Sequence, residues 1–256
     1  MVKAIFFDID GTLFSHNSQE IPHSTKQALR KLRDKGIKTF IATGRHFVEM
    51  KALPIDASDY DGMIVLNGQI CVDGDGKILY ESPLDDNDLK EIVRIFNLKE
   101  IPVLLIERDR IYINIVNDIV VEAQKTFSLP TPEIGEYSGA KIYQACIYAN
   151  VEQEKMIMSK LVKCKTTRWN EYGIDLLSDC GGKDVGIGHV LNYYGIKRTE
   201  SMAFGDGEND VDMLKFAGIG VAMGNAAESA KECADYVTTD IDHDGIYNAL
   251  KLFEII

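Results

Sequence analysis

Two aspartates follow the first apolar run of the sequence. Residues 4–7, Ala-Ile-Phe-Phe, have the length and character of a buried strand, and Asp8 and Asp10 come directly after it, on either side of Ile9. Side chains alternate along a strand, so both carboxylates point the same way where the strand ends. A divalent cation would offset their repulsion, and Mg²⁺ commonly bridges carboxylates to a phosphate. On its own the pattern is equally compatible with a solvated acidic turn.

Thr43 and Gly44 follow a second strand-like run, residues 37–42. A hydroxyl and a backbone amide without a neighbouring side chain suit a phosphate oxygen, although most such turns are structural. Lys183 stands at the start of a predicted helix, where the helix dipole disfavours a cation unless an anion also binds there. A single lysine in such a place is normally solvated, so these residues become informative only in combination.

A third strand-like run, residues 201–205, leads into the segment Gly-Asp-Gly-Glu-Asn-Asp. This segment supplies Asp206, Asn209 and Asp210, and its glycines allow close approach of the backbone. An acidic turn that caps the next helix would explain it alone. However, the four polar segments lie at junctions of the same kind, and ligands bind at the carboxyl ends of parallel strands. The combination predicts one site for a divalent metal and a phosphate group.

The elements that must position these residues alternate between strand and helix. Residues 24–36 have helical spacing, with Ser24 as the expected N-cap and Gly36 as the end. Residues 70–81 are expected to form two strands around an Asp-Gly turn. Alternation of strands and helices resumes after residue 181. The pattern predicts an α/β fold with a Rossmann-like, doubly wound and mostly parallel sheet.

The middle of the chain has a different pattern. Paired strand candidates lie among helical stretches here, including a hairpin around Arg108 and Asp109. Such a mixture is typical of a separate α+β unit. We therefore expect a core domain made of residues 1–83 and 181–256, with residues 84–180 inserted between them as a cap domain.

Composition restricts the partners. The 256 residues are 45% hydrophobic and carry a formal net charge of −12, which disfavours nucleic acid and anionic membranes because both require a basic surface. The five cysteines form no Cys-x-x-Cys pair, which predicts reduced thiols in a cytoplasmic protein and argues against structural zinc. We find no signal peptide or membrane span. Local features would have to bind an anionic substrate, and the oligomeric state stays open.

Four motifs, in this order, resemble those of a known family. Asp-Ile-Asp-Gly-Thr at 8–12, Thr-Gly-Arg at 43–45, Lys183, and Gly-Asp-Gly-Glu-Asn-Asp at 205–210 are similar to the signatures of the haloacid dehalogenase-like superfamily of phosphohydrolases, in particular its Cof-like branch. The similarity covers essentially the whole chain. The first and last motifs are specific, whereas the other two are weak alone. The branch usually has Gly after the motif lysine, but this sequence has Asp184, which could alter how Lys183 is held.

The resemblance implies a role for each of these residues. Asp8 would attack phosphorus, and Asp10 would protonate the leaving oxygen and then activate water. Magnesium would be held by Asp8, the backbone carbonyl of Asp10 and Asp206, with Asp210 in support. Phosphate would be bound by the backbone at Ile9 and by Thr43, Gly44, Lys183 and Asn209. Such an arrangement suits phosphoryl transfer, which depends on positioning and on charge neutralisation.

Several other residues could take part, although ordinary structural roles are favoured for most. Four histidines are expected to lie in exposed loops or to pack within helical segments. Two aromatic residues are expected to pack inside the inserted unit, and one asparagine is expected to shape the site. For Arg45, contact with the substrate and support of the inserted unit are equally favoured. These histidines are His16, His23, His46 and His189, the aromatic residues are Trp169 and Tyr172, and the asparagine is Asn225.

We therefore expect a magnesium-dependent phosphatase that hydrolyses a small phosphorylated metabolite through an aspartyl-phosphate intermediate. Sugars, phosphorylated cofactors and nucleotides all stay open as the leaving group. A phosphomutase would use the same intermediate but return the phosphoryl group to a sugar. A non-catalytic module would need the metal and anion sites without an acid–base residue, so the presence of both Asp8 and Asp10 favours an enzyme.

Overall fold

The computed structural model describes residues 1–126, 130–168 and 173–256. Trp169 and Tyr172 lie outside the described residues, so their expected packing role stays a prediction. Within the described part of the chain, no helix combines the length and the apolar character needed to cross a bilayer.

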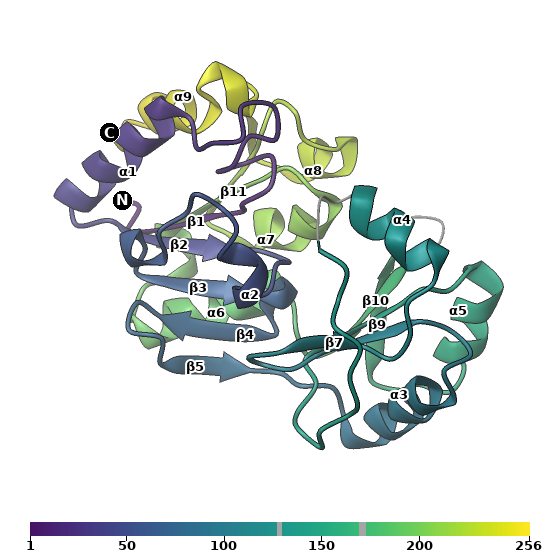
Figure 1. Cartoon of the computed structure of the whole chain (residues 1–256). Helices are drawn as coiled ribbons and strands as arrows, with labels where there is room; N and C mark the ends of the chain where they lie inside the picture. The colour runs from purple at the N-terminus through teal and green to yellow at the C-terminus, as the bar shows by residue number, and fades with distance from the viewer. Residues whose placement is uncertain (127–129, 169–172) are drawn as a thin grey trace. The chain divides into compact units, whose positions relative to one another are not determined.

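The chain divides into two compact units, drawn in Figure 1. Residues 1–81 and 181–256 form the core unit, and residues 82–180 form the inserted unit. The segment expected as an insert, residues 84–180, falls within the second of these units.

A mostly parallel sheet lies at the centre of the core unit. Its strand order is β13-β12-β11-β1-β2-β3-β4-β5. Neighbouring strands run parallel from β13 to β3, whereas β4 and β5 are antiparallel additions at one edge. The strands are β1 (Ala4–Phe7), β2 (Lys38–Ala42), β3 (Gly62–Val65), β4 (Ile70–Asp73), β5 (Ile78–Glu81), β11 (Ser201–Gly205), β12 (Ile219–Ala222) and β13 (Tyr236–Val237). The predicted α/β fold is confirmed.

Helices cover this sheet because its central strands are apolar on both faces. All of β1 is buried, and its successive residues point to opposite sides. The ring of Phe6 stacks on Phe40 with centroids 5.0 Å apart, and on the other side Phe7 stacks on Phe204 at 5.3 Å. The core helices are α1 (His23–Asp34), α2 (Phe47–Met50), α6 (Lys183–Tyr193), α7 (Val211–Phe216), α8 (Glu228–Cys233) and α9 (Gly245–Leu252).

The ends of α1 test the helix prediction directly. Gly36 follows the helix with φ of 69°, a left-handed conformation that glycine adopts without strain, so the predicted end is confirmed. The predicted cap is wrong, because α1 begins at His23 with Pro22 at the N-cap and no side-chain cap. Pro22 has extended backbone at ψ of 143°, which leaves Ser24 inside the first turn. The predicted β4–β5 hairpin is confirmed, with Gly76 in its turn at φ of 79°.

The inserted unit is an α+β structure with its own core. Among its described residues, the sheet is antiparallel with strand order β7-β6-β8-β10-β9. One hydrophobic cluster joins the helices Asp86–Leu98 and Val151–Met158 to this sheet and includes Ile92, Phe96, Leu105, Ile157 and Leu176. The elements are α3 (Asp86–Leu98), β6 (Val103–Ile106), β7 (Ile111–Ile113), α4 (Asp118–Thr126), β8 (Gln144–Ile147), α5 (Val151–Met158), β9 (Cys164–Arg168) and β10 (Ile174–Ser178).

Candidate active site

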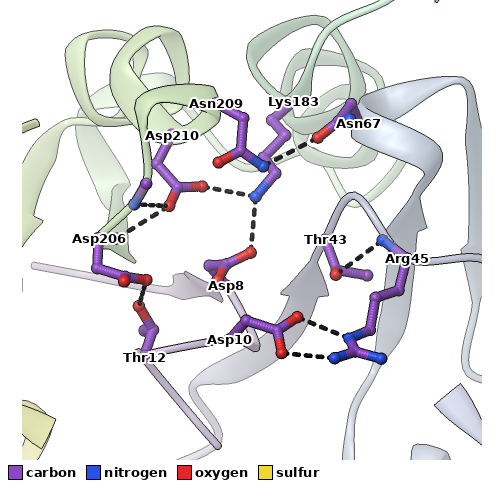
Figure 2. A network of polar contacts seen from close by, with 11 residues as sticks. Asp8, Asp10, Thr12, Thr43, Arg45, Asn67, Lys183, Asp206, Asn209 and Asp210 are labelled. Carbon is purple, nitrogen blue, oxygen red and sulfur yellow. Dashed lines mark hydrogen bonds and ion pairs between the residues drawn. The ribbon is translucent and has the colours of Figure 1, made fainter. Parts of the chain in front are cut away.

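The predicted site residues meet at the carboxyl ends of three adjacent parallel strands. Asp8 and Asp10 follow β1, Thr43 follows β2, and Asp206 follows β11. Lys183 is the first residue of α6, and its side chain reaches the same place (Figure 2). Since β1 lies between β2 and β11, the fold alone brings residues that are almost 200 positions apart in the sequence into contact.

Lys183 is the buried cation at the centre of the site. Its Nζ donates to Asp8 Oδ1 at 2.7 Å and to Asp210 Oδ1 at 2.5 Å, and its side chain has no exposed surface. Burial alone would lower the pKa of Lys183, but the carboxylates of Asp210 and Asp8 outweigh it and raise the pKa above its ordinary value. Lys183 therefore stays charged. Asp184 is not among its ion-pair partners in the described residues.

Asp210 shapes the loop that carries Asp206. Its Oδ2 accepts hydrogen bonds from the backbone amides of Asp206 and Gly207, both at 2.9 Å, while its Oδ1 faces Lys183. Asp206 is oriented in turn by Thr12, whose hydroxyl donates to Asp206 Oδ1 at 2.9 Å. Gly11 makes this approach possible, because a Cβ at Gly11 would lie 2.2 Å from Asp206 Oδ2. These contacts explain why both motifs combine acids with glycines.

The acidic cluster fits a divalent cation. Asp8, Asp206 and Asp210 can each offer one oxygen, and these three atoms lie within 4.8 Å of one another. Burial raises the pKa of Asp8 well above its ordinary value, and repulsion from Asp210 and Asp206 adds to the effect. Burial, followed by repulsion from Asp210, raises the pKa of Asp206 to about 6. One lysine does not neutralise three carboxylates, and oxygen donors of this kind suit Mg²⁺.

Stabilisation by Mg²⁺ should therefore depend on pH. Below about pH 6 protons compete for Asp206, so Mg²⁺ should raise the melting temperature little at pH 5 and more at pH 7 and above. At a concentration about 100 times Kd, the stabilisation would reach ~2.7 kcal/mol. In the metal-free protein the contribution of Asp206 to stability, measured against Asp206→Asn, should show the opposite trend, since a raised carboxyl pKa means that this contribution falls as pH rises from about 4 to about 6. Thermal melts across this range check both trends.

Asp206→Asn removes one of the two carboxyl groups with a raised pKa and should reduce the pH dependence of the Mg²⁺ effect. Asp212→Asn makes the same chemical change at an exposed position on α7 and should keep it. A Mg²⁺ effect of equal size at pH 5 and pH 8 in the parent protein would contradict the assignment.

The predicted phosphate-binding residues surround the same point. Thr43 is buried, and its hydroxyl accepts a hydrogen bond from the amide of Arg45 at 3.1 Å. Asn209 donates from Nδ2 to Asn67 Oδ1 at 3.1 Å (Figure 2). A Cβ at Gly44 would lie 3.0 Å from the same Asn67 oxygen, so the turn and Asn67 pack closely. Ile9, expected to use its backbone, is buried between the two aspartates.

Sequence reasoning missed Asn67. This residue follows β3 in a left-handed conformation, with φ of 51°, and its backbone amide donates to the carbonyl of Thr43 at 3.0 Å. Asparagine directly before glycine, as in Asn67-Gly68, is a turn signal that is visible in the sequence. Its contact with Asn209 depends on the fold, because the two residues are 142 positions apart.

Asp10 has partners that the sequence did not suggest. Arg45 donates two hydrogen bonds to its carboxylate, from Nε to Oδ2 at 2.6 Å and from Nη2 to Oδ1 at 2.7 Å. This hydrogen bond to Asp10 is the main reason why the pKa of Arg45 is raised. His16 Nε2 lies 3.0 Å from Asp10 Oδ1, so this histidine, expected in an exposed loop, contacts the site although its side chain is 58% exposed.

The remaining histidines lie away from these contacts. His23 is exposed and pairs with Gln27. His46 is fully buried and caps α2, where its Nδ1 accepts from the amide of Val48. His189 stacks on Tyr80 with ring centroids 3.8 Å apart.

Asn225 ties together three loops around the acidic cluster. Its Nδ2 donates to the carbonyl of Gly11 at 2.9 Å and to Asp206 Oδ2 at 3.4 Å, and its Oδ1 accepts from the amide of Ile241 at 3.0 Å. These contacts match the shaping role that the sequence suggested for it.

The α/β core and its site of carboxylates and one buried lysine define an enzyme that hydrolyses phosphate esters. A model of the haloacid dehalogenase-like hydrolase family matches residues 5–250, and the chain belongs to this family. It is 33% identical to YkrA of Bacillus subtilis over 252 residues, which cover 97% of this chain and 96% of that protein.

Solved structures extend the likeness to three dimensions. The structure of BT1666 from Bacteroides thetaiotaomicron, studied among phosphatases of this superfamily, has a TM-score of 0.89 and 35% identity over 100% of this chain and 96% of that chain. BT4131, described as a sugar phosphatase of subclass IIB, has a TM-score of 0.85 and 36% identity over 100% of both chains. The resemblance inferred from the motifs is confirmed, and the protein is a phosphatase.

Proposed function

We propose that this phosphatase hydrolyses a small sugar phosphate in a magnesium-dependent reaction through an aspartyl-phosphate intermediate. The observation that carries the proposal is the contact of Lys183 with Asp8, at 2.7 Å, inside a cluster of carboxylates and next to Asp10. Lys183 fixes and partly neutralises the Asp8 carboxylate, which is what a nucleophile needs when it approaches an anionic phosphate.

The chain's own residues have distinct tasks in this scheme. Asp8 attacks phosphorus while the leaving oxygen takes a proton from Asp10. Asp10 then accepts a proton from the water that attacks the aspartyl phosphate, which releases inorganic phosphate and restores Asp8. The hydroxyl of Thr43, the backbone of Gly44 and the side chain of Asn209 hold the phosphate oxygens during both steps, and Figure 2 shows Thr43 and Asn209 near Asp8.

Asp8 and Asp206 would hold Mg²⁺ together with the backbone carbonyl of Asp10. When bound, the ion would supply positive charge that offsets the negative charge of the transferring phosphoryl group. Asp210 supports these ligands through the amides of Asp206 and Gly207, and its other oxygen belongs to Lys183. Excess chelator should therefore remove activity, and activity should return when Mg²⁺ is added.

The substrate class rests on likeness to BT4131, described as a sugar phosphatase, which shares 36% identity over the whole of both chains. We infer that the inserted unit selects the leaving group, since the core residues named above are assigned to the phosphate group, the metal and the proton transfers. The −12 net charge of the protein agrees with a small, locally bound anion as its substrate.

The direct test measures phosphate release from a panel of phosphorylated sugars, cofactors and nucleotides with Mg²⁺. Sugar phosphates should be hydrolysed fastest, and Asp8→Asn protein purified in the same way should release only background phosphate. Faster release from nucleotides or cofactors would overturn the substrate class but leave the phosphatase in place. Transfer between positions of a sugar without release of phosphate would identify a mutase, and binding without turnover a non-catalytic module.

A further inference from the structure

We propose that His16 is a positioning residue for Asp10. The inference rests on the proposed function, because it assumes that Asp10 transfers protons. It concerns a residue that belongs to none of the four motifs and that the mechanism above does not use. The structure places its ring on the carboxylate that must serve both chemical steps.

The contact gives Asp10 a third polar partner. Arg45 already donates to both oxygens in one plane, from Nε at 2.6 Å and from Nη2 at 2.7 Å. His16 Nε2 approaches Oδ1 at 3.0 Å. At this distance ionised Asp10 attracts an N–H group at Nε2, which both the neutral tautomer and the cation can carry. The role is therefore one of geometry and does not require His16 to change its charge.

His16 is itself held in place from both sides. Ser15 donates from its hydroxyl to Asp242 Oδ1 at 2.6 Å, and Asn17 donates from Nδ2 to Asp242 Oδ2 at 2.7 Å. Its ring also packs edge-on against buried Phe14, with centroids 5.3 Å apart and planes at 88°. An exposed histidine would ordinarily sample several rotamers, but a loop fixed at the residues before and after it presents the ring in one direction.

The energetic reason lies in the double task of Asp10. The same oxygens must face the leaving group in the first step and water in the second, and misplacement by about 1 Å can cost roughly 10²-fold in rate. A polar contact with a charged group in a partly exposed site contributes about a factor of ten. His16→Ala should therefore lower kcat about tenfold and leave KM nearly unchanged, since His16 acts on Asp10 and not on the bound substrate.

A double-mutant cycle isolates this route. In the Asp10→Ala background, His16→Ala should change the residual kcat less than twofold, because the group that it positions is gone. His16→Gln can place an amide N–H near the same oxygen and should recover most of the loss. Asp242→Asn should weaken the tie at Ser15 and lower kcat in the same direction, whereas His23→Ala, at an exposed histidine nearby, should have no effect.

The outcomes separate this inference from the proposed function. Equal losses from His16→Ala in the parent and Asp10→Ala backgrounds, or no loss in either, would overturn the positioning role while phosphatase activity remains. The contact can also be read without turnover, by ¹⁵N NMR of the imidazole nitrogens. The His16 resonances should shift in Asp10→Ala and stay unchanged in His23→Ala. Unchanged His16 resonances in Asp10→Ala would overturn the contact even where no substrate is hydrolysed.

Discussion

Asp10→Asn is expected to accumulate a phosphoryl group on Asp8 when the substrate is an aryl phosphate. An aryl oxide leaves with little protonation, so the first step continues, whereas the second step still needs a base to activate water. Loss of general acid–base catalysis should slow overall turnover by about 10²–10⁴-fold. Asp8→Asn should carry no phosphoryl group and should lose turnover to background, since an amide is a poor nucleophile and a weaker metal ligand.

Intact-protein mass spectrometry after rapid acid quench measures the added phosphoryl group, and peptide mapping locates it. Asp212→Asn is the matched control, because it makes the same change at an exposed position and should behave like the parent protein. If neither the parent protein nor Asp10→Asn ever carries phosphate on Asp8 while turnover is measurable, direct attack by water would replace the covalent mechanism.

Lys183→Met should have the second large effect, on stability as well as on activity. Methionine fills a similar volume without the charge, so Asp8 and Asp210 would face each other in a buried site with no cation between them. Breaking a buried ion pair in this way typically costs about 3–5 kcal/mol. We also expect turnover to fall to background, because Lys183 neutralises charge beside the attacking carboxylate.

The loss of stability in Lys183→Met should shrink as pH falls, since burial raises the pKa of Asp8 and protonation of Asp8 removes its repulsion with Asp210. Urea unfolding at pH 5 and pH 8 measures this difference. Lys215→Met is the control, because it removes an exposed lysine from α7 and should change stability little at either pH. Equal stability of Lys183→Met and the parent protein at pH 8 would show that the buried charges are compensated by other groups.

The positions of the chemical residues could be predicted because each follows a strand or begins a helix. Asp8, Thr43 and Asp206 sit where a buried run ends, and the parallel order of the strands brings such ends together. Glycine next to an acid was also informative, as the close approach of Gly11 to Asp206 shows. Local sequence and strand pairing are sufficient for this level of prediction.

Contacts that depend on side chains from distant loops could not be predicted. The hydrogen bonds from Arg45 to Asp10 require that two side chains 35 positions apart in the sequence point toward each other. The contact of His16 with the same carboxylate depends on Asp242, which is 227 positions from Ser15. The predicted start of α1 was wrong for a local reason. Pro22 occupies the N-cap position, so the helix begins one residue before Ser24. The four-residue helix α2 is too short to produce a helical period.

The position of β1 in the sheet has a consequence for the order in which the protein folds during synthesis. Ala4 pairs with Lys38 on one side and with Ser201 on the other. The side of β1 that pairs with β11 therefore has no partner until about four fifths of the chain has left the ribosome. Closing so long a loop is entropically costly. The inserted unit needs only its own segment, so we expect it to fold first and the core to close around β1 last.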